Sequence, residues 1–280
     1  MDGADKGLRR DGGPEEADPA DEYVGPEGLM HCGVCHAPRQ CRIRLWDRER
    51  TVPCLCRCQE EERRRRERQM EEEERLRRIR HMRAVGIQEK SLGGWCFEAA
   101  EDTVNLRMAK RYVENWERVK EENLGLLFWG DVGTGKTFLA ACIANALIAK
   151  GVPVLMTNFS KILNQMGGLY LEERHRYVAS LAGFRLLVID DLGIERNTEY
   201  ALEQVYSVID ERYKAGLPMI ATTNLTIGQL RSPEDVAHAR IYSRVLEMCT
   251  PVHVAGGDRR KAIGKEKQDL AKRMLLERDG

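Results

Sequence analysis

The sequence predicts an α/β fold with a five-stranded parallel sheet, preceded by a small cysteine-rich module. In the second half of the chain, apolar runs typical of strands buried on both faces alternate with helix-like segments. Near the N-terminus, six cysteines fall within residues 32–58, a segment too short to build an apolar core of its own. The expected strands are LGLLFW (124–129), VPVLMTN (152–158), FRLLVIDD (184–191), LPMIATTN (217–224) and PVHVA (251–255).

The first thirty residues are acidic, rich in Gly and Pro, and nearly free of apolar residues. Such a segment cannot bury enough surface to offset the entropy of ordering, so residues 1–30 are expected to be disordered. They lack an apolar signal segment, and no run of about 18 apolar residues follows. Lys+Arg and Asp+Glu are both 45, so the net charge provides no general attraction to nucleic acid. We expect a cytoplasmic protein without a membrane segment.

The spacing of cysteines in residues 31–58 is typical of a zinc site. Cys32 and Cys35 form one Cys-x-x-Cys pair. The second cluster offers one thiol more than a four-ligand site requires: Cys54, Cys56 and Cys58. Further candidates are Cys41, His31 and His36. Structural zinc stabilises small peptides by about 10–16 kcal/mol, enough to fold a module that has no apolar core.

Residues 59–84 alternate blocks of acidic and basic side chains. Many Glu–Arg pairs fall three or four residues apart, a spacing that stabilises a solvated helix. The glutamates cancel most of the field of the basic blocks, so a charged helical linker is expected rather than a DNA-binding element.

The chemistry is concentrated in a glycine-rich turn. The segment GDVGTGKT, residues 130–137, satisfies the phosphate-loop pattern GxxxxGK[ST] and lies between a predicted strand and a predicted helix. Lys136 is expected to reach the β- and γ-phosphates of a nucleotide, and the Thr137 hydroxyl to bind Mg²⁺. The residues expected to surround the phosphates are Gly130, Gly133, Thr134, Gly135, Lys136 and Thr137.

A second predicted strand ends in Asp190 and Asp191, at the end where open α/β sheets bind ligands. Asp190 is expected to hold the Mg²⁺, and Asp191 to orient or deprotonate the attacking water. Many NTPases carry Glu at the latter position, so the shorter Asp indicates slow, switch-like turnover. Strand 217–224 ends in Thr222, Thr223 and Asn224, and a polar residue at this strand tip can contact the γ-phosphate or the water.

Two arginines lie four residues apart on a predicted helix, HARIYSRVLEMC, residues 238–249. Arg240 and Arg244 therefore project from the same side, and guanidinium groups are suited to binding phosphate. The alternative is a solvated pair bound to Glu247 or Asp235.

Together, GDVGTGKT, LLVIDDLG, ATTN and ARIYSRVLEMC, followed by GGDRRK, resemble the AAA+ ATPases of the DnaC type. These are bacterial and phage helicase loaders, related to the IstB transposition ATPases. The resemblance covers roughly residues 85–262, and several such loaders have a similar N-terminal zinc module. It implies a P-loop AAA+ fold with a reduced lid, and ATP, Mg²⁺ and structural Zn²⁺ as cofactors.

The resemblance also implies roles for individual residues. Lys136 and Thr137 are the Walker A residues, Asp190 and Asp191 the Walker B pair, and Asn224 is sensor 1. Arg244 is the finger delivered to a neighbouring subunit's ATP, and Arg240 its support. Arg260 is sensor 2, with Arg259 a rival. The family's usual second knuckle favours a ligand set of Cys32, Cys35, Cys56 and Cys58.

By the same resemblance, the chain is a replication protein that places a replicative helicase on single-stranded DNA and self-associates through the arginine finger. An ATPase assisting a transposase and a non-catalytic adaptor are the alternatives. Residues 167–181 are a candidate DNA contact, and equally an ordinary surface helix. Their candidate side chains are Tyr170, Arg174, Arg176 and Tyr177.

These assignments divide the chain into five segments. They are a disordered acidic segment (1–30), a zinc-binding module (31–58), a charged helical linker (59–84), an AAA+ ATPase domain (85–257) and a basic C-terminal tail (258–280).

Overall fold

The structure is a computed structural model of the chain, and it describes residues 22–194 and 198–275. The chain forms two compact units that divide between Glu74 and Arg75, inside helix α1 (Arg57–Gly86). Most of the segment predicted to be disordered, residues 1–21, lies outside the described residues, as do residues 276–280 of the predicted tail.

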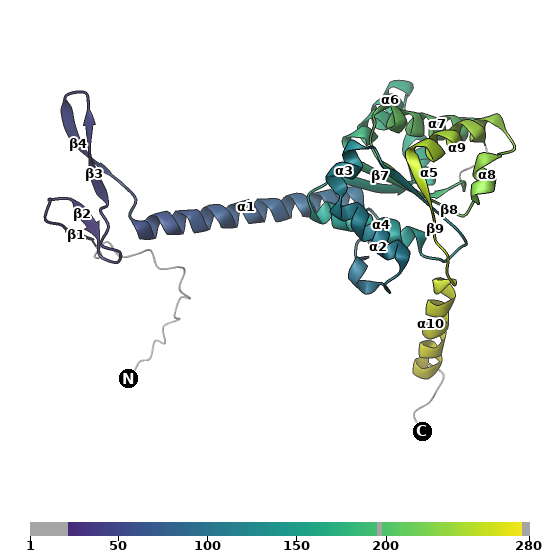
Figure 1. Ribbon diagram of the computed structural model, residues 1–280, viewed down its shortest axis with the longest axis horizontal. Coiled ribbons are helices and arrows are strands. Elements are labelled where there is room, and N and C mark those ends of the chain that lie inside the picture. Colours follow the sequence, from purple (N-terminus) through teal and green to yellow (C-terminus); the bar gives the residue numbers. More distant parts are fainter. Residues whose placement is uncertain (1–21, 195–197, 276–280) are drawn as a thin grey trace, which may run out of the picture. The chain divides into compact units, whose positions relative to one another are not determined.

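The first unit contains two antiparallel hairpins (Figure 1). One pairs β1 (Glu22–Val24) with β2 (Met30–Cys32), and the other pairs β3 (Gln40–Leu45) with β4 (Arg48–Pro53). The buried apolar side chains among residues 22–74 are Leu29, Cys32 and Cys56. This unit therefore has almost no apolar core, as the sequence predicts.

The prediction of disorder is wrong for residues 22–30, which form β1, the turn that follows it and the first residue of β2. Glu22 forms an ion pair with Arg39, and the ring of Tyr23 stacks on that of His31 with centroids 5.6 Å apart. The order of this segment comes from backbone pairing with a strand that ends in a cysteine, which composition alone does not reveal.

Helix α1 covers the predicted linker, and Glu–Arg ion pairs at helical spacing line its exposed surface. Its C-terminal part belongs to the second unit, because Ile79 and Met82 pack against that unit's core. Gly86 is buried, and Ile87 forms a parallel bridge with Met156. The predicted boundary between residues 84 and 85 therefore falls inside a helix whose end is already packed.

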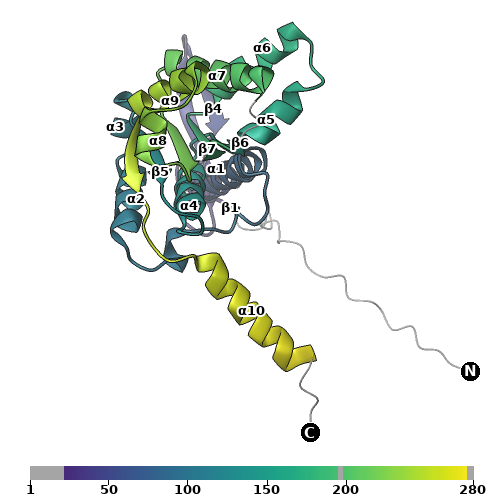
Figure 2. The ribbon, with the colours of Figure 1, turned by 90° about the vertical axis from the view of Figure 1, so that its right-hand side faces the viewer.

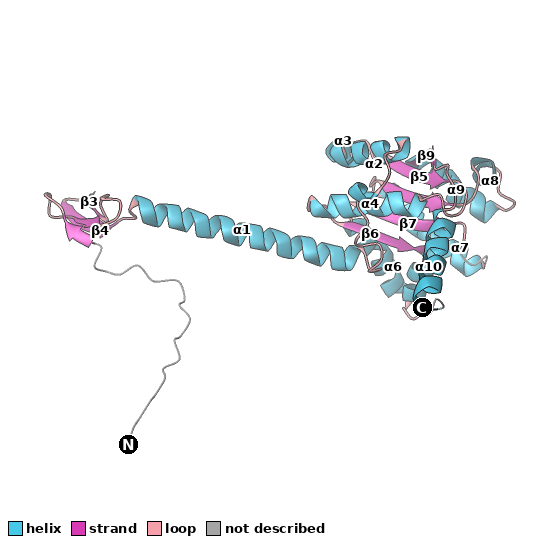
Figure 3. Cartoon of the chain, turned by 90° about the horizontal axis from the view of Figure 1, so that it is seen from below, coloured by secondary structure: helices cyan, strands magenta, loops and turns pink. Residues whose placement is uncertain are grey.

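The second unit is built on a five-stranded sheet whose strands all run parallel, as predicted (Figure 3). Its spatial order is β6-β7-β8-β5-β9. The strands are β5 (Gly125–Trp129), β6 (Val154–Asn158), β7 (Leu186–Leu192), β8 (Met219–Thr223) and β9 (Cys249–His253). The predicted α/β fold is confirmed.

Helices cover both faces of this sheet, with α4 on one side and α7 and α9 on the other (Figure 2). The helices are α2 (Val104–Glu114), α3 (Trp116–Glu121), α4 (Lys136–Ala149), α5 (Phe159–Met166), α6 (Leu171–Ser180), α7 (Glu199–Lys214), α8 (Ile227–Arg231), α9 (Val236–Met248) and α10 (Arg259–Leu275), with short 3-10 turns η2 (Phe97–Ala99) and η3 (Leu181–Gly183). Leu186 and Val188 of β7 pack in the apolar core on the α4 side of the sheet. Leu187 and Ile189 pack in the core on the side of α7 and α9. An uninterrupted apolar run is what a strand buried on both faces requires.

Side-chain caps set the starts of two helices that matter for the site. Thr198 accepts the N–H of Ala201 at the start of α7, and Asp235 accepts that of His238 at the start of α9. After β9, the described part of the chain adds one helix, α10, in keeping with a reduced lid. No helix in the described ranges is both long and apolar enough to cross a bilayer.

Candidate functional site

The glycine-rich turn between β5 and α4 closes around the Lys136 ammonium group. Nζ donates to the carbonyl oxygens of Gly130 at 2.8 Å and Asp131 at 2.7 Å, and the residue is buried. This burial is the main reason that the pKa of Lys136 lies below its ordinary value. Gly133 has φ +81°, and a Cβ there would come within 2.0 Å of the Asp258 carboxylate. Only glycine fits this position, where the chain after β9 packs on the loop.

One carboxylate oxygen of Asp190 accepts two hydroxyl groups. The Thr137 hydroxyl donates to Oδ1 at 2.9 Å, and the Thr222 hydroxyl donates to the same atom at 2.6 Å. Thr137 lies in the first turn of α4 and Thr222 in β8, so this oxygen links the phosphate loop to two strands. Burial raises the pKa of Asp190, and the two hydroxyl groups oppose that shift by stabilising the anion.

A β-bulge gives the two neighbouring carboxylates different environments. Pairing between β7 and β8 changes register between Ile189 and Leu192, and Asp191 has φ +58°. The Asp191 N–H donates to Thr222 Oγ1 at 2.9 Å, which holds this uncommon backbone conformation. Bulges commonly re-aim side chains beside functional sites. Here Asp190 faces the two hydroxyls, while Asp191 is exposed.

A cavity of about 590 Å³ beside the loop collects most residues of the predicted nucleotide site. The predicted residues that line it are Gly133, Gly135, Lys136, Thr137, Asp191, Asn224 and Arg260. Arg259, the predicted rival for sensor 2, lines it as well. Thr134 lines a smaller hollow next to this cavity. Gly130 lies in the loop, where its carbonyl oxygen accepts the hydrogen bond from Lys136 Nζ.

Arg240 and Arg244 lie on α9 and are absent from the lining of this cavity. Arg244 forms an ion pair with Asp210 at 2.7 Å and donates to the Tyr206 hydroxyl at 3.2 Å. Its guanidinium also lies 4.5 Å from the ring centroid of Tyr213. Arg240 is exposed, with its guanidinium 5.4 Å from the Tyr206 ring.

The carboxylates considered from the sequence as partners of the two arginines have other contacts. Glu247 accepts a hydrogen bond from the Tyr213 hydroxyl at 2.7 Å, and Asp235 lies 2.5 Å from His238 Nδ1. The alternative in which Glu247 or Asp235 binds the two arginines therefore names the wrong carboxylates. Asp210 was missed because it lies on a different helix.

Four thiols converge in the first unit. The Sγ atoms of Cys32, Cys35, Cys56 and Cys58 all lie within 4.8 Å of one another. A tetrahedral site with Zn–S bonds of about 2.3 Å places its sulfur atoms about 3.8 Å apart, so this donor set fits zinc. Hydrogen bonds from the backbone of Cys58 and Ala37 lower the pKa of Cys35 to about 6, whereas the hydrogen bond with Cys35 and then burial raise the pKa of Cys58 to about 12.

The other predicted metal-ligand candidates point elsewhere. The Cys54 thiol donates to the Pro38 carbonyl at 3.5 Å, and its pKa is raised by burial and then by neighbouring Cys41. Both candidate histidines have oxygen partners. His31 Nδ1 lies 2.9 Å from the Leu29 carbonyl oxygen, and His36 Nδ1 lies 3.2 Å from the Tyr23 hydroxyl.

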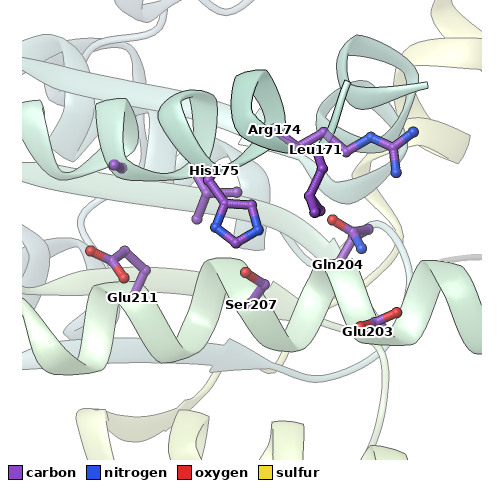
Figure 4. Close-up of a pocket in the computed structure, with 9 residues that line it drawn as sticks. Leu171, Arg174, His175, Glu203, Gln204, Ser207 and Glu211 are labelled. Carbon is purple, nitrogen blue, oxygen red and sulfur yellow. The ribbon is translucent and has the colours of Figure 1, made fainter. Parts of the chain in front are cut away.

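The predicted DNA-facing segment forms α6 and the turn before it. Tyr170 and Arg176 are exposed there, whereas Arg174 lies over the ring of Tyr200 at 5.3 Å and Tyr177 bonds to Gln165. A hollow of about 250 Å³ separates α6 from α7, and Figure 4 shows the His175 ring projecting from α6 toward α7. Only part of the predicted set is therefore free to meet a ligand.

The fold and the cavity define a phosphate-loop α/β protein with a nucleotide site at the carboxyl ends of parallel strands. A model of the family described as "IstB-like ATP binding protein" matches residues 55–267, well over half of the chain. The chain belongs to this family, which confirms the predicted resemblance.

Among curated proteins, the chain is similar to two replicative helicase loaders. It is 28% identical to DnaI of Bacillus subtilis (strain 168) over 197 residues, which is 64% of this chain and 62% of that protein. It is 27% identical to DnaC of Escherichia coli (strain K12) over 128 residues, 45% of this chain and 51% of that protein. The chain therefore spans less than two thirds of either relative.

Two solved structures have the same fold. The crystal structure of DnaI superposes with a TM-score of 0.52 and 22% identity, covering 64% of this chain and 98% of that one. The crystal structure of the DnaC helicase loader gives a TM-score of 0.51 and 25% identity, covering 60% and 100% respectively.

We predict one zinc ion per chain, held by the four converging thiols. Changing both Cys32 and Cys35 to Ser removes two ligands, so the purified protein should lose its zinc, as measured by elemental analysis. The matched control changes Cys41 and Cys54 to Ser, two thiols outside the group. Zinc retained in the first variant, or lost equally in both, would show that the ligand set is wrong.

We also predict that Thr222→Val slows ATP hydrolysis about tenfold or more while leaving ATP affinity nearly unchanged. The change keeps the volume of the side chain but removes one donor to Asp190 and the acceptor for the Asp191 N–H. A hydrogen bond to a charged group contributes about 1.5–3 kcal/mol. With one donor lost, the pKa of Asp190 rises further, so activity should fall at a higher pH on acidification.

The control for this variant is Thr223→Val. Thr223 is equally buried, but it donates to the Leu192 carbonyl at 2.7 Å and touches neither carboxylate. Both variants should lose similar stability in thermal unfolding, whereas Thr222→Ser should restore turnover. Equal kinetic defects in Thr222→Val and Thr223→Val would refute the specific role.

Proposed function

We propose that this chain is an ATP-hydrolysing DNA replication protein that places a replicative helicase on single-stranded DNA, with ATP as the switch. The observation that carries the ATPase assignment is the single cavity lined by Lys136, Thr137, Asp191 and Asn224. The helicase assignment is supported by the relatives named replicative helicase loaders. A separate cysteine module is also suited to docking a partner.

The larger cavity and the smaller hollow beside the loop share part of their walls, so a nucleoside triphosphate could extend from one into the other. Gly135, Phe138 and Arg259 line both, so one extended ligand can occupy them together. The phosphates would lie beside Lys136 in the larger cavity, which also has room for much of the nucleoside, and the smaller hollow next to Thr134 adds only about 50 Å³.

Each group near the phosphates then has a chemical role. The Thr137 hydroxyl and the Asp190 carboxylate are hard oxygen ligands of the kind that Mg²⁺ prefers, and a bound Mg²⁺ would neutralise charge on the phosphates. Asp191 would orient the attacking water, and Asn224 would contact it or the γ-phosphate. Arg260 would contribute positive charge, as sensor 2. The short Asp191 side chain supports slow turnover.

A second candidate is an ATPase that assists a transposase, which the IstB-like description of the family favours. The cysteine module favours the helicase loader, because it provides a dedicated element for a partner. A non-catalytic adaptor is less well supported, since the Lys136, Thr137, Asp190 and Asn224 set is complete.

The loading function is tested by retention of a replicative helicase on bead-bound single-stranded DNA. Wild type should retain the helicase when ATP is present. Lys136→Ala should bind no ATP, because it lacks the ammonium group facing the phosphates, and should retain little helicase. Asp191→Asn should bind ATP and hydrolyse it poorly. ATP affinity in Lys136→Ala equal to wild type would remove the nucleotide site, and capture of a transposase instead of the helicase would select the second candidate.

Self-association through an arginine remains part of the proposal, and the contacts favour a revised division of roles. Arg244 is held by Asp210 and two tyrosine rings, so it fixes α9 to α7. Arg240 is exposed on the same side of α9 and would be the residue that reaches a neighbouring subunit's ATP.

The two arginines can be separated by matched alanine variants. We predict that Arg240→Ala binds ATP normally but hydrolyses it about tenfold or more slowly, because a trans arginine accelerates hydrolysis by up to about 10³–10⁵. Mixing it with Lys136→Ala, which retains Arg240, should restore part of the activity. Arg244→Ala should instead lower the midpoint of thermal unfolding. If Arg240→Ala is fully active, while Arg244→Ala is stable but inactive, then Arg244 is the residue that acts on the neighbouring subunit's ATP.

A further inference from the structure

The hairpin of β3 and β4 lies in the first unit (Figure 1), and a two-residue turn, Trp46–Asp47, joins its strands. Trp46 is 95% exposed, and its neighbour Leu45 is 47% exposed. Trp46 also has φ +58°, a left-handed conformation that bulky residues rarely adopt and that turns usually assign to Gly or Asn. The fold tolerates both exposed apolar surface and backbone strain at this residue, a combination that marks functional positions.

The pairing register separates the side chains of this hairpin onto two faces. Leu45 lies opposite Arg48 and Ile43 opposite Arg50, so these four share one face. Arg44 lies opposite Glu49 on the other face. The first face therefore combines apolar side chains with two cations, next to the tryptophan.

A hollow of about 490 Å³ lies on that first face. It is lined by Leu45, Trp46, Asp47, Arg48 and Arg50. Within the described part of the chain, neither arginine has a carboxylate at ion-pairing distance. Asp47 is the one acidic side chain in the lining, so positive charge prevails there.

We propose that the tip of this hairpin binds single-stranded DNA, with a base stacked on the Trp46 indole and phosphates bound by Arg48 and Arg50. Base–aromatic stacking next to a basic groove is the general way in which proteins hold single strands. In a duplex the faces of the bases are covered by their neighbours, so an indole can stack there only by unstacking a base step, and an unpaired base is favoured. The inference depends on the proposed function only in sharing single-stranded DNA as ligand, and it adds a contact outside the ATPase unit.

The charges favour DNA over a protein partner. Arg48 and Arg50 are two residues apart on one strand, and successive same-face positions lie about 6.6–6.8 Å apart. Two cations in a row beside an aromatic ring match a chain of alternating phosphates and bases. The apolar surface is a single indole and a leucine, which is small for a protein interface.

The test uses the full-length chain, with zinc and without nucleotide, and fluorescein-labelled oligothymidylate. Trp46→Ala should weaken binding by about 5- to 150-fold, the loss expected for one stacked base, and Trp46→Phe should weaken it less. Oligothymidylate should also quench part of the emission of the four tryptophans in wild type. That part should be missing in Trp46→Phe, which still binds.

The matched pair for the charge is Arg48→Gln and Arg44→Gln, which remove the same charge from opposite faces of the hairpin. Arg48→Gln should reduce the slope of log affinity against log salt by about 0.7, and Arg44→Gln should leave it unchanged. Equal slopes for the two variants overturn the proposal, as does binding of a duplex as tight as that of the single strand. Unchanged DNA affinity in Trp46→Ala, with weaker capture of the helicase, assigns this surface to a protein and also overturns it.

The test of DNA binding by the hairpin can fail or succeed independently of the test of helicase loading. Quenching of Trp46 by DNA should persist in Lys136→Ala, where ATP-dependent loading is lost. If loading is intact in wild type but no quenching by Trp46 occurs, the hairpin inference alone fails. If quenching occurs but wild type retains no helicase on DNA, the proposed function alone fails.

Discussion

Oδ1 of Asp190 accepts hydrogen bonds from two hydroxyl groups on two different elements, and the geometry of the nucleotide cavity depends on this atom. The sheet order places β8 between β7 and β5, so the carboxylate and the phosphate loop are not on adjacent strands. Thr137 at the end of the loop and Thr222 on the intervening strand both donate to this oxygen, so it joins the three elements across that gap. Burial raises the pKa of this carboxyl group, and the two donors oppose that shift by stabilising the anion. The bond from Thr137 also holds its hydroxyl in the position from which it can reach a metal.

The parts of this site that were predictable from the sequence are those written in local patterns. The glycines and lysine of residues 130–137 and the apolar run before Asp190 each carry their signal within ten residues or fewer. Thr222 could be placed at a strand tip, but its bonds to the two aspartates were not predictable, because they depend on the register that aligns Ile189 with Ala221 and on the bulge that follows. Neither property can be read from one sequence. The strand β1 was missed for a related reason, since its stability comes from pairing with Met30–Cys32 and not from its own composition.

The arginines of α9 illustrate the same limit between helices. Their spacing correctly places both on one side of the helix, but the partner of Arg244 is a set of side chains on α7. Tyr206, Asp210 and Tyr213 lie four and three residues apart, so they form one stripe facing α9. A half-buried arginine paired with a carboxylate and lying over two rings loses much of its freedom to reach another subunit. Arg240, one turn earlier, lies near only Tyr206 of this stripe and remains exposed. Arg244 therefore packs α9 against α7, while Arg240 is free to contact another subunit.

The two units obtain their order from different sources, and this difference bears on what their surfaces can do. The second unit has a sheet with an apolar core on each face, so its exposed side chains rest on a rigid layer. The hairpin of β3 and β4 has only two strands, and such a pair is marginally stable in water by itself. Its base is next to the four converging thiols, where zinc would supply the missing folding energy. A metal bound there would hold the base of the hairpin but would not cover its tip, so the hairpin could be stabilised while Trp46 stays exposed to a ligand.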